Sequence, residues 1–139
     1  MSAPSRVSHP IRVIYGDTDQ MGVVYYANYF RFFEVGRNEL CRAREIPYRE
    51  VEAEGFILPV VEAQARYQEP ARYDDLLRLD TWVSSVGRVQ LRFDYELYRS
   101  ADDTLLVSGH TVHACLGEGG RLRRLPDRLR AALLTARGE

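Results

Sequence analysis

The sequence predicts an α+β fold in which an antiparallel sheet covers a long helix. Three observations lead to this prediction: a strand-like segment at residues 7–15, a helix-like segment at residues 24–44, and a series of strand-like segments after Gly55. The helix carries aromatic and aliphatic residues around most of its circumference, so other structure must cover it on several sides. A single sheet can do this only if it curls around the helix.

The helix is indicated by a change of period at about residue 24. Polar residues then recur at spacings of three and four and form one narrow stripe, which consists of Asn28, Arg31, Glu34, Asn38 and Arg42. The helix should end at Ile46-Pro47, because a residue before proline disfavours the α region. Residues 16–22, which precede the helix, are rich in aspartate and glycine and should form a loop.

The later strands are predicted at residues 57–69, 76–86, 89–99 and 105–116. Apolar and polar residues alternate along them, and turn residues separate them, so neighbouring strands should be mostly antiparallel. A short helix at residues 126–137 should follow. A curved antiparallel sheet wrapped around one long central helix is the hotdog architecture. No linker or repeat divides residues 1–139, which are therefore expected to form a single domain.

Composition argues against several classes of function. The formal net charge of −1 and the pI of about 6.3 give no general attraction to nucleic acid. The chain has no run of about 18 apolar residues that could span a membrane, and no signal-peptide pattern. Cys41 and Cys115 are far apart and are expected to be free thiols. We therefore expect a cytoplasmic protein.

The loop before the helix contains the residues that point to chemistry. Asp17 and Asp19 lie between Gly16 and Gly22, close to a helix N-terminus. One explanation is capping, because an aspartate there accepts hydrogen bonds from free N–H groups and favours the helix dipole. However, Asp19 lies well before the clear helical pattern, and a simple cap does not require the aromatic residues that follow it.

The second explanation is acyl transfer. Free N–H groups at a helix N-terminus can hold a carbonyl oxygen and stabilise the oxyanion that forms when the carbonyl is attacked. A carboxylate beside that carbonyl can act as a nucleophile or as a general base for water. The loop and the helix start together would supply both parts needed to hydrolyse an activated ester.

The same stretch resembles a known family. The run D-T-D-Q-M-G-V-V-Y-Y-A-N-Y at residues 17–29, followed by F-E-V-G-R, resembles the 4-hydroxybenzoyl-CoA thioesterase-like family. It is most similar to the small bacterial acyl-CoA thioesterases related to the Tol–Pal-associated enzyme. Further similarity lies at residues 66–75, 109–114 and 123–126, so the resemblance covers nearly the whole chain.

The resemblance implies the hotdog fold and hydrolysis of an acyl-CoA thioester. It assigns Asp19, the second aspartate of the D-x-D motif, as the catalytic carboxylate and the backbone N–H of Tyr26 as the group that polarises the thioester carbonyl. Gly22, Val24 and Tyr25 would lie around the substrate. Asp17 is interpreted as a residue that orders the loop. Whether Asp19 attacks directly or activates water stays open.

Three alternatives come from the same fold. A non-catalytic acyl-CoA-binding protein would not need Asp19. A dehydratase commonly relies on a His and an acid near the helix start, and this loop has no histidine. A thioesterase for acyl carrier protein stays open, because that substrate has the same phosphopantetheine arm as coenzyme A.

Other polar residues have two interpretations each. Asn28 could bind substrate or hold the loop. Glu34 could approach the acyl group, although pairing with Arg31, Arg37 or Asn38 on the same helix is the simpler expectation. Coenzyme A carries phosphates, which arginine binds well. Phosphate contact and a solvated surface are both open for the arginines of this chain, among them Arg88, Arg123 and Arg124.

The histidines do not predict a metal site. His110 and His113 are three residues apart in a predicted strand, so they should point to opposite faces. We expect no metal and no other cofactor.

The chain is expected to form a homodimer or homotetramer. Apolar bulk falls on both faces of the strand after residue 104, which is more than a solvated sheet carries. The family resemblance implies sheets paired edge to edge, with each active site between two subunits.

Overall fold

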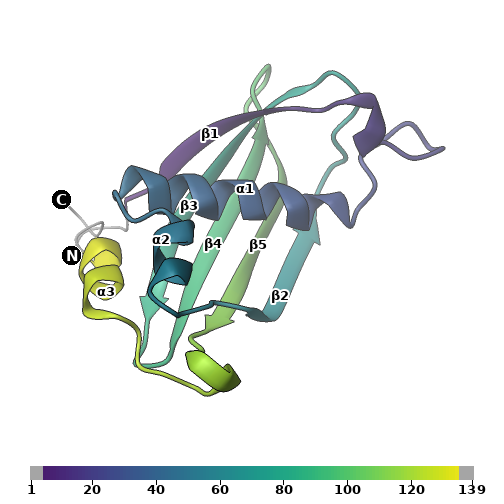
Figure 1. Ribbon diagram of the computed structural model, residues 1–139. Coiled ribbons are helices and arrows are strands. Elements are labelled where there is room, and N and C mark those ends of the chain that lie inside the picture. The colour runs from purple at the N-terminus through teal and green to yellow at the C-terminus, as the bar shows by residue number, and fades with distance from the viewer. Residues whose placement is uncertain (1–4, 135–139) are drawn as a thin grey trace.

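The computed structural model describes residues 5–134 and forms a curved sheet with helices on its concave face (Figure 1). The α-helices of this part are α1 (Asn28–Ala43), α2 (Tyr48–Ala53) and α3 (Asp127–Leu134). The strands are β1 (Val7–Arg12), β2 (Val60–Tyr67), β3 (Leu76–Val86), β4 (Gln90–Arg99) and β5 (Thr104–Ala114).

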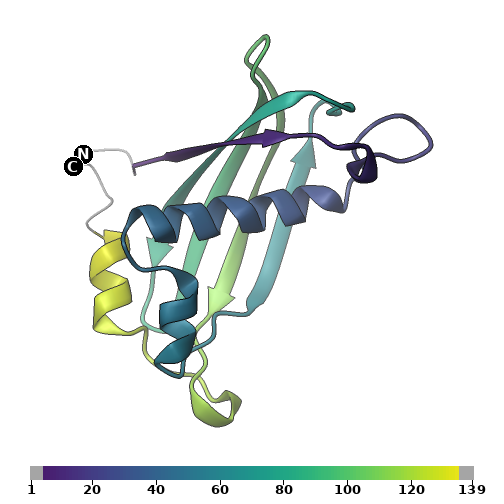
Figure 2. The same cartoon turned by 45° about the horizontal axis from the view of Figure 1, so that its top comes forward.

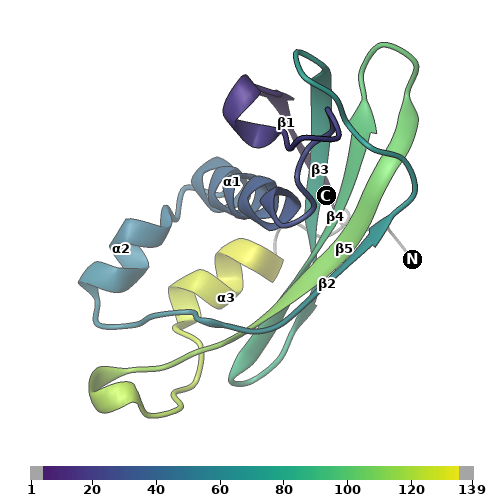
Figure 3. The ribbon, with the colours of Figure 1, turned by 90° about the vertical axis from the view of Figure 1, so that its right-hand side faces the viewer.

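The sheet has the strand order β1-β3-β4-β5-β2, and every neighbouring pair is antiparallel. Consequently β1 and β2, which are far apart in the sequence, form its two edges. Figure 3 shows all three helices on one side of the sheet, with α1 in its hollow. The predicted α+β hotdog fold is confirmed.

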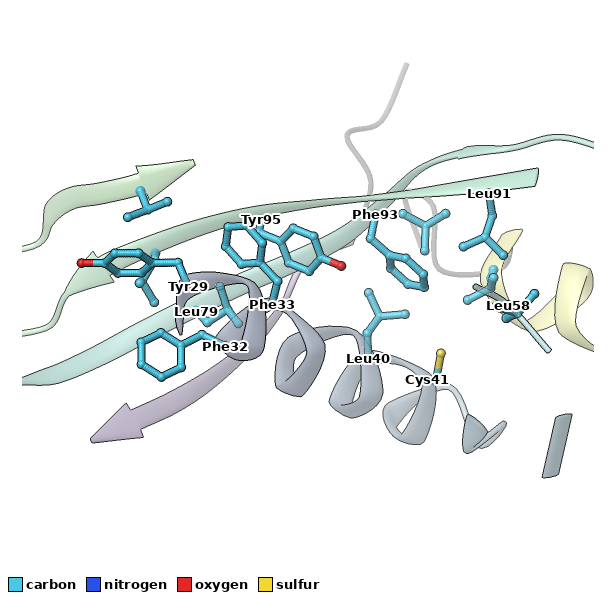
Figure 4. Packing of buried hydrophobic residues seen from close by; sticks show 14 of the residues in the cluster. Tyr29, Phe32, Phe33, Leu40, Cys41, Leu58, Leu79, Leu91, Phe93 and Tyr95 are labelled. Carbon is cyan, nitrogen blue, oxygen red and sulfur yellow. The ribbon is translucent and has the colours of Figure 1, made fainter. Parts of the chain in front are cut away.

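The core lies between α1 and the concave face of the sheet. Phe33 of α1 stacks flat on Tyr95 of β4 with ring centroids 4.2 Å apart (Figure 4). At Gly36 the helix comes so close to β3 that an added Cβ would lie 2.4 Å from Thr81 Oγ1. Every second residue of β3 and β4 packs into this core, as the alternation predicts: Leu77, Leu79, Thr81, Val83, Leu91, Phe93, Tyr95 and Leu97.

The structure corrects several predicted boundaries. The central helix begins at Asn28 rather than at residue 24, because the backbone of residues 24–25 is bonded elsewhere. The Val24 N–H donates to Ala71 O, and the Tyr25 N–H donates to Asp17 O. The helix ends at Ala43, before Pro47 as expected, but Pro47 then caps α2, which the sequence did not predict. The predicted terminal helix is confirmed as α3; its last predicted residues, 135–137, lie outside the described residues.

The two ends of the sheet carry different features. Arg12 at the end of β1 pairs with Leu76 at the start of β3, so the aspartate-rich loop that follows β1 lies at this end. β2 runs toward the same end (Figure 2), and Tyr67 is its last residue. The β3–β4 hairpin, which contains Arg88, and Val60 at the start of β2 lie at the opposite end.

Candidate active site

Asp17 holds the loop that precedes α1. It is the last residue of a short 3-10 turn, and its side chain is buried. The carboxylate accepts a hydrogen bond from the Ile14 N–H at 2.9 Å and forms an ion pair with Arg31 of α1. Its backbone oxygen accepts from the Tyr25 N–H and from Asn28 Nδ2, each at 2.9 Å. Asp17 therefore orders the loop, as the sequence suggested.

Asp19 lies in a tight turn that Gly22 closes. The Gly22 N–H donates to Asp19 O at 3.0 Å, and Gly22 has a φ of 80°, which glycine adopts at little cost. The Met21 N–H donates to Asp19 Oδ1 at 2.8 Å. Among residues 5–134 no group donates to Asp19 Oδ2, so one carboxylate oxygen is fixed and the other is available.

Two backbone N–H groups are available immediately before α1. The N–H groups of Asn28, Tyr29 and Phe30 donate to the carbonyl groups three residues earlier. Those of Tyr26 and Ala27 have no acceptor within the part of the chain that the structure describes. Tyr26 therefore precedes the helix rather than beginning it, but its N–H group is free, as an oxyanion donor must be.

A hollow of about 220 Å³ joins Asp19 and Tyr26. Val24 lines it as well, whereas Gly22 and Tyr25 do not. The Tyr25 ring instead lies outside against Tyr26, with centroids 4.8 Å apart. The remaining lining residues were not predicted as site residues, although several lie in the motifs quoted above: Met21, Val23, Tyr29, Tyr67, Gln68, Glu69 and Pro70.

Two of these additional residues fix the floor of the hollow. The Tyr29 hydroxyl accepts a hydrogen bond from the Ala71 N–H at 3.1 Å. The Tyr67 ring packs on Tyr29 with centroids 5.6 Å apart, and its hydroxyl donates to Tyr26 O at 3.4 Å. The motif-like stretch at residues 66–75 was the sequence signal for this wall, but periodicity alone could not place it beside Asp19.

Asn28 and Glu34 have separate roles. Asn28 is the first residue of α1, and its bond to Asp17 O supports the loop-holding interpretation. Glu34 forms no ion pair within residues 5–134, so the expected pairing on α1 is not observed. Its candidate partners Arg31 and Arg37 instead contact Asp17 and Tyr95. Glu34 lines a second cavity, of about 260 Å³, farther along α1.

The predicted phosphate-binding arginines are not beside Asp19 of the same chain. Arg88 and Arg124 line a hollow of about 380 Å³ with Arg130, at the β3–β4 hairpin end of the sheet. Arg123 is separate, because its side chain packs over Gly117. The histidines point to opposite faces as predicted: His110 contacts Glu62 at 2.6 Å, and His113 is turned inward. Among the described residues, no three or more His, Cys, Asp or Glu side chains gather where they could hold a metal.

Comparison with known proteins decides the family. Residues 13–133 match the thioesterase-like superfamily. The chain belongs to this superfamily. The acyl-CoA thioesterase YbgC of Haemophilus influenzae is 36% identical over 128 residues, which are 90% of this chain and 92% of that protein. The 1,4-dihydroxy-2-naphthoyl-CoA hydrolase of Synechococcus elongatus is 34% identical over 122 residues, 85% of this chain and 88% of that one.

A solved structure has the same fold as this chain. The hypothetical protein TT1821 of Thermus thermophilus superimposes with a TM-score of 0.87 at 33% identity, over 93% of this chain and 98% of that one. The arrangement of sheet and central helix is therefore that of a thioesterase-like hotdog protein. No described helix is long and apolar enough to cross a membrane.

Proposed function

We propose that this protein is a single-domain acyl-CoA thioesterase that hydrolyses its substrate to a free acid and coenzyme A, with Asp19 as the catalytic carboxylate. The observation that carries the proposal is the shared hollow: Asp19, with a carboxylate oxygen to which no described group donates, and Tyr26, whose N–H has no described acceptor, both line it. The names of the relatives support the substrate class, because YbgC and the naphthoyl-CoA hydrolase both act on coenzyme A thioesters.

The geometry suits attack on a thioester carbonyl. The Tyr26 N–H would donate to the carbonyl oxygen and stabilise the negative charge that develops on it. Asp19 would then act in one of two ways. It attacks the carbon and forms an anhydride that water opens, or it takes a proton from a water molecule that attacks instead. In both routes the C–S bond breaks and coenzyme A leaves as its thiol after protonation.

A homodimer would complete the site. β1 contains Pro10, which lacks an N–H group and makes that edge a poor partner, whereas β2 contains no proline and exposes Val60, Val61 and Tyr67. Two β2 edges paired antiparallel about a two-fold axis would place Tyr67 of one subunit near Val60 of the other. The exposed aromatic and apolar side chains that line the Asp19 hollow, Met21, Tyr26 and Tyr67, would then be covered.

The same pairing gives the arginines a role. Val60 and the hollow of Arg88, Arg124 and Arg130 lie at one end of the sheet, and Asp19 lies at the other. In the dimer this hollow would therefore lie on the side of the partner's Asp19, where it can hold the phosphates of coenzyme A. The cytoplasm suits the buried, unpaired thiols of Cys41 and Cys115.

The test is release of thiol from a panel of acyl-CoA esters by the wild type and by Asp19→Asn. The substitution keeps the shape but removes the anionic oxygen, so we expect turnover to fall by about 10²- to 10⁴-fold or more with an unchanged melting temperature. Activity should persist after dialysis against EDTA. Near wild-type turnover in Asp19→Asn would remove this residue from its role.

Three further outcomes separate the alternatives. Binding of acyl-CoA without hydrolysis would indicate a non-catalytic binder. Hydrolysis of acyl carrier protein esters alone would identify a different carrier. Light scattering should give the mass of two or four chains for the fully active protein, and the mass of one chain would exclude the shared site.

A further inference from the structure

The second cavity has the composition of a ligand site. It measures about 260 Å³ and lies between the second half of α1 and the residues that lead into β2. Its walls are mainly apolar and include Cys41, Leu58, Pro59, Val60 and Phe93. The polar groups come from Glu34, Arg37 and Asn38 of α1, from Tyr48 of α2 and from His113 of β5. Apolar walls with a few placed polar groups are typical of sites for small organic groups.

Arg37 and Glu34 are the charged groups of α1 that line this cavity, and within residues 5–134 they do not form an ion pair with each other. Arg37 Nη1 donates to the Tyr95 hydroxyl at 3.5 Å, the outer limit of a hydrogen bond. No described carboxylate lies within ion-pair distance of it, whereas Arg31 pairs with Asp17 and Arg42 with Glu39. Arg37 is half-buried, so its remaining donors gain from an oxygen acceptor supplied by a ligand.

A directed chain of hydrogen bonds orients the Tyr95 hydroxyl beside Arg37. His113 Nδ1 lies 2.8 Å from Leu58 O, and a carbonyl only accepts, so Nδ1 carries the proton. Burial lowers the pKa of His113 to about 4, so the ring is neutral at pH 7 and Nε2 accepts from the Thr111 hydroxyl at 2.9 Å. Thr111 Oγ1 in turn accepts from the Tyr95 hydroxyl at 2.7 Å. The Tyr95 oxygen is thereby left to accept from Arg37.

The cavity lies too far along α1 to serve Asp19 of its own chain with a short acyl group. At 1.5 Å per residue, Arg37 is about 15 Å along the helix axis from Ala27. Val60 lines this cavity, and Tyr67 lines the Asp19 hollow. Antiparallel pairing of two β2 edges would bring these residues of different subunits together, so the cavity would extend the partner's hollow.

We propose that Arg37 selects the acyl group: the cavity receives the acyl part of a substrate bound at the partner's Asp19, and the guanidinium favours acyl groups with an oxygen acceptor near the far end over plain hydrocarbon of equal length. Tyr95, Thr111 and His113 are positioning residues for Arg37. This inference rests on the proposed thioesterase function and narrows its substrate class.

The test compares matched pairs of esters, succinyl-CoA with butyryl-CoA and 4-hydroxybenzoyl-CoA with benzoyl-CoA. The wild type should have the higher kcat/KM for the oxygenated member of at least one pair. Arg37→Met removes the donors but keeps much of the apolar length, so it should reduce that preference about 10- to 100-fold. Arg42→Met, an exposed position on the same helix, is the matched control and should keep the wild-type preference.

The hydrogen-bond chain has a test of its own. Thr111→Val removes the hydroxyl that joins Tyr95 to His113 and should weaken the preference, whereas Thr111→Ser should retain it. A role in stability alone would lower the melting temperature without changing the ratio between the paired esters. If Arg37→Met does not fold, Arg37→Lys, which keeps the charge but loses the planar group, should reduce the preference in the same direction.

The outcomes distinguish this inference from the function on which it rests. The role of Arg37 would be overturned if the ratio of kcat/KM between the oxygenated and the plain ester were the same in the wild type and in Arg37→Met. A wild-type preference for the plain ester of both pairs would overturn it too. In either case Asp19-dependent hydrolysis would stand. Absence of hydrolysis with every ester would overturn the proposed function itself.

Discussion

At the N-terminal end of α1, one carboxylate oxygen of Asp19 has no partner among residues 5–134, whereas beside the second half of the helix His113 uses both ring nitrogens. The loop around Asp19 is shaped by backbone hydrogen bonds and surrounded by exposed tyrosines. The region around His113 is shaped by buried side chains from α1, β4 and β5. The contrast shows where this fold leaves groups free for chemistry and where it satisfies them for stability.

The largest predicted change in stability tests the buried side of this comparison and should come from the protonation of His113. In the unfolded chain its pKa is about 6.5, and in the folded protein burial lowers the pKa to about 4. Between these values the unfolded state binds the proton and the folded state does not. The free energy of unfolding should therefore decrease as pH falls from 6.5 to 4, by about 3 kcal/mol in total.

Denaturant titrations at pH 7, 5.5 and 4.5 measure this effect. His113→Gln cannot be protonated, so its stability should fall less steeply over the same range. Parallel curves for the two proteins would mean that His113 is not the buried neutral group that the hydrogen bonds indicate.

The next largest change in stability should come from Gly109, which packs against Phe33 next to the hydrogen-bond chain. An added Cβ at Gly109 would lie 2.3 Å from Gln64 O and 2.8 Å from the Phe33 ring, which stacks on Tyr95. Gly109→Ala should therefore cost about 2 kcal/mol, because the backbone of β2 cannot move away without losing its pairing with β5. Gly16→Ala, at a loop position with open space around it, is the control and should be nearly neutral. Thermal unfolding of both variants decides the point.

Asp17→Asn should have a smaller effect on stability, of about 1 to 2 kcal/mol. The amide cannot replace the charged bonds to Arg31 and the Ile14 N–H, but Arg31 is largely exposed and can be hydrated. Asp19→Asn should leave stability unchanged while abolishing turnover. Chemical denaturation and thiol release should be measured on both variants. If Asp17→Asn reduced turnover more than Asp19→Asn, the roles given to the two aspartates would have to be exchanged.

The smallest effect should come from Arg88 and Arg124. Each exposed arginine contributes less than about 1 kcal/mol to phosphate contact, so the double variant with methionine should raise KM for an acyl-CoA several-fold. The corresponding acyl-pantetheine lacks the nucleotide phosphates, and its KM should not change. An equal rise in KM for both esters would show that the arginines act on the shape of the site.

Most of the fold could be predicted from the sequence, because the spacing of apolar residues along a strand or helix indicates which of its faces is buried. The alternation in β4 and the apolar circumference of α1 were sufficient for the sheet and the central helix. The predicted start of α1 was wrong by four residues. The side chains of Val24 and Tyr25 are compatible with a helix, but their backbone N–H groups donate to Ala71 O and Asp17 O, which lie outside the helix. The short α2 has too few residues for a period to appear.

The candidate site was predicted in part, for a similar reason. Asp19 and Tyr26 are close in the sequence, and their local motif was informative. Tyr67 reaches them only through the register of β2, and the cavity of Arg37 and His113 requires the crossing of α1 over the sheet. Contacts of that kind depend on tertiary packing, which periodicity does not report.

The proline in β1 has a consequence for how the protein assembles at high concentration. A sheet with two open edges can recruit neighbours on both sides and grow into a filament. Here Pro10 interrupts one edge, so β2 is the better edge for a neighbour, and in the proposed dimer two such edges would satisfy each other. Edge-to-edge association should therefore stop at a closed pair and not continue as polymerisation.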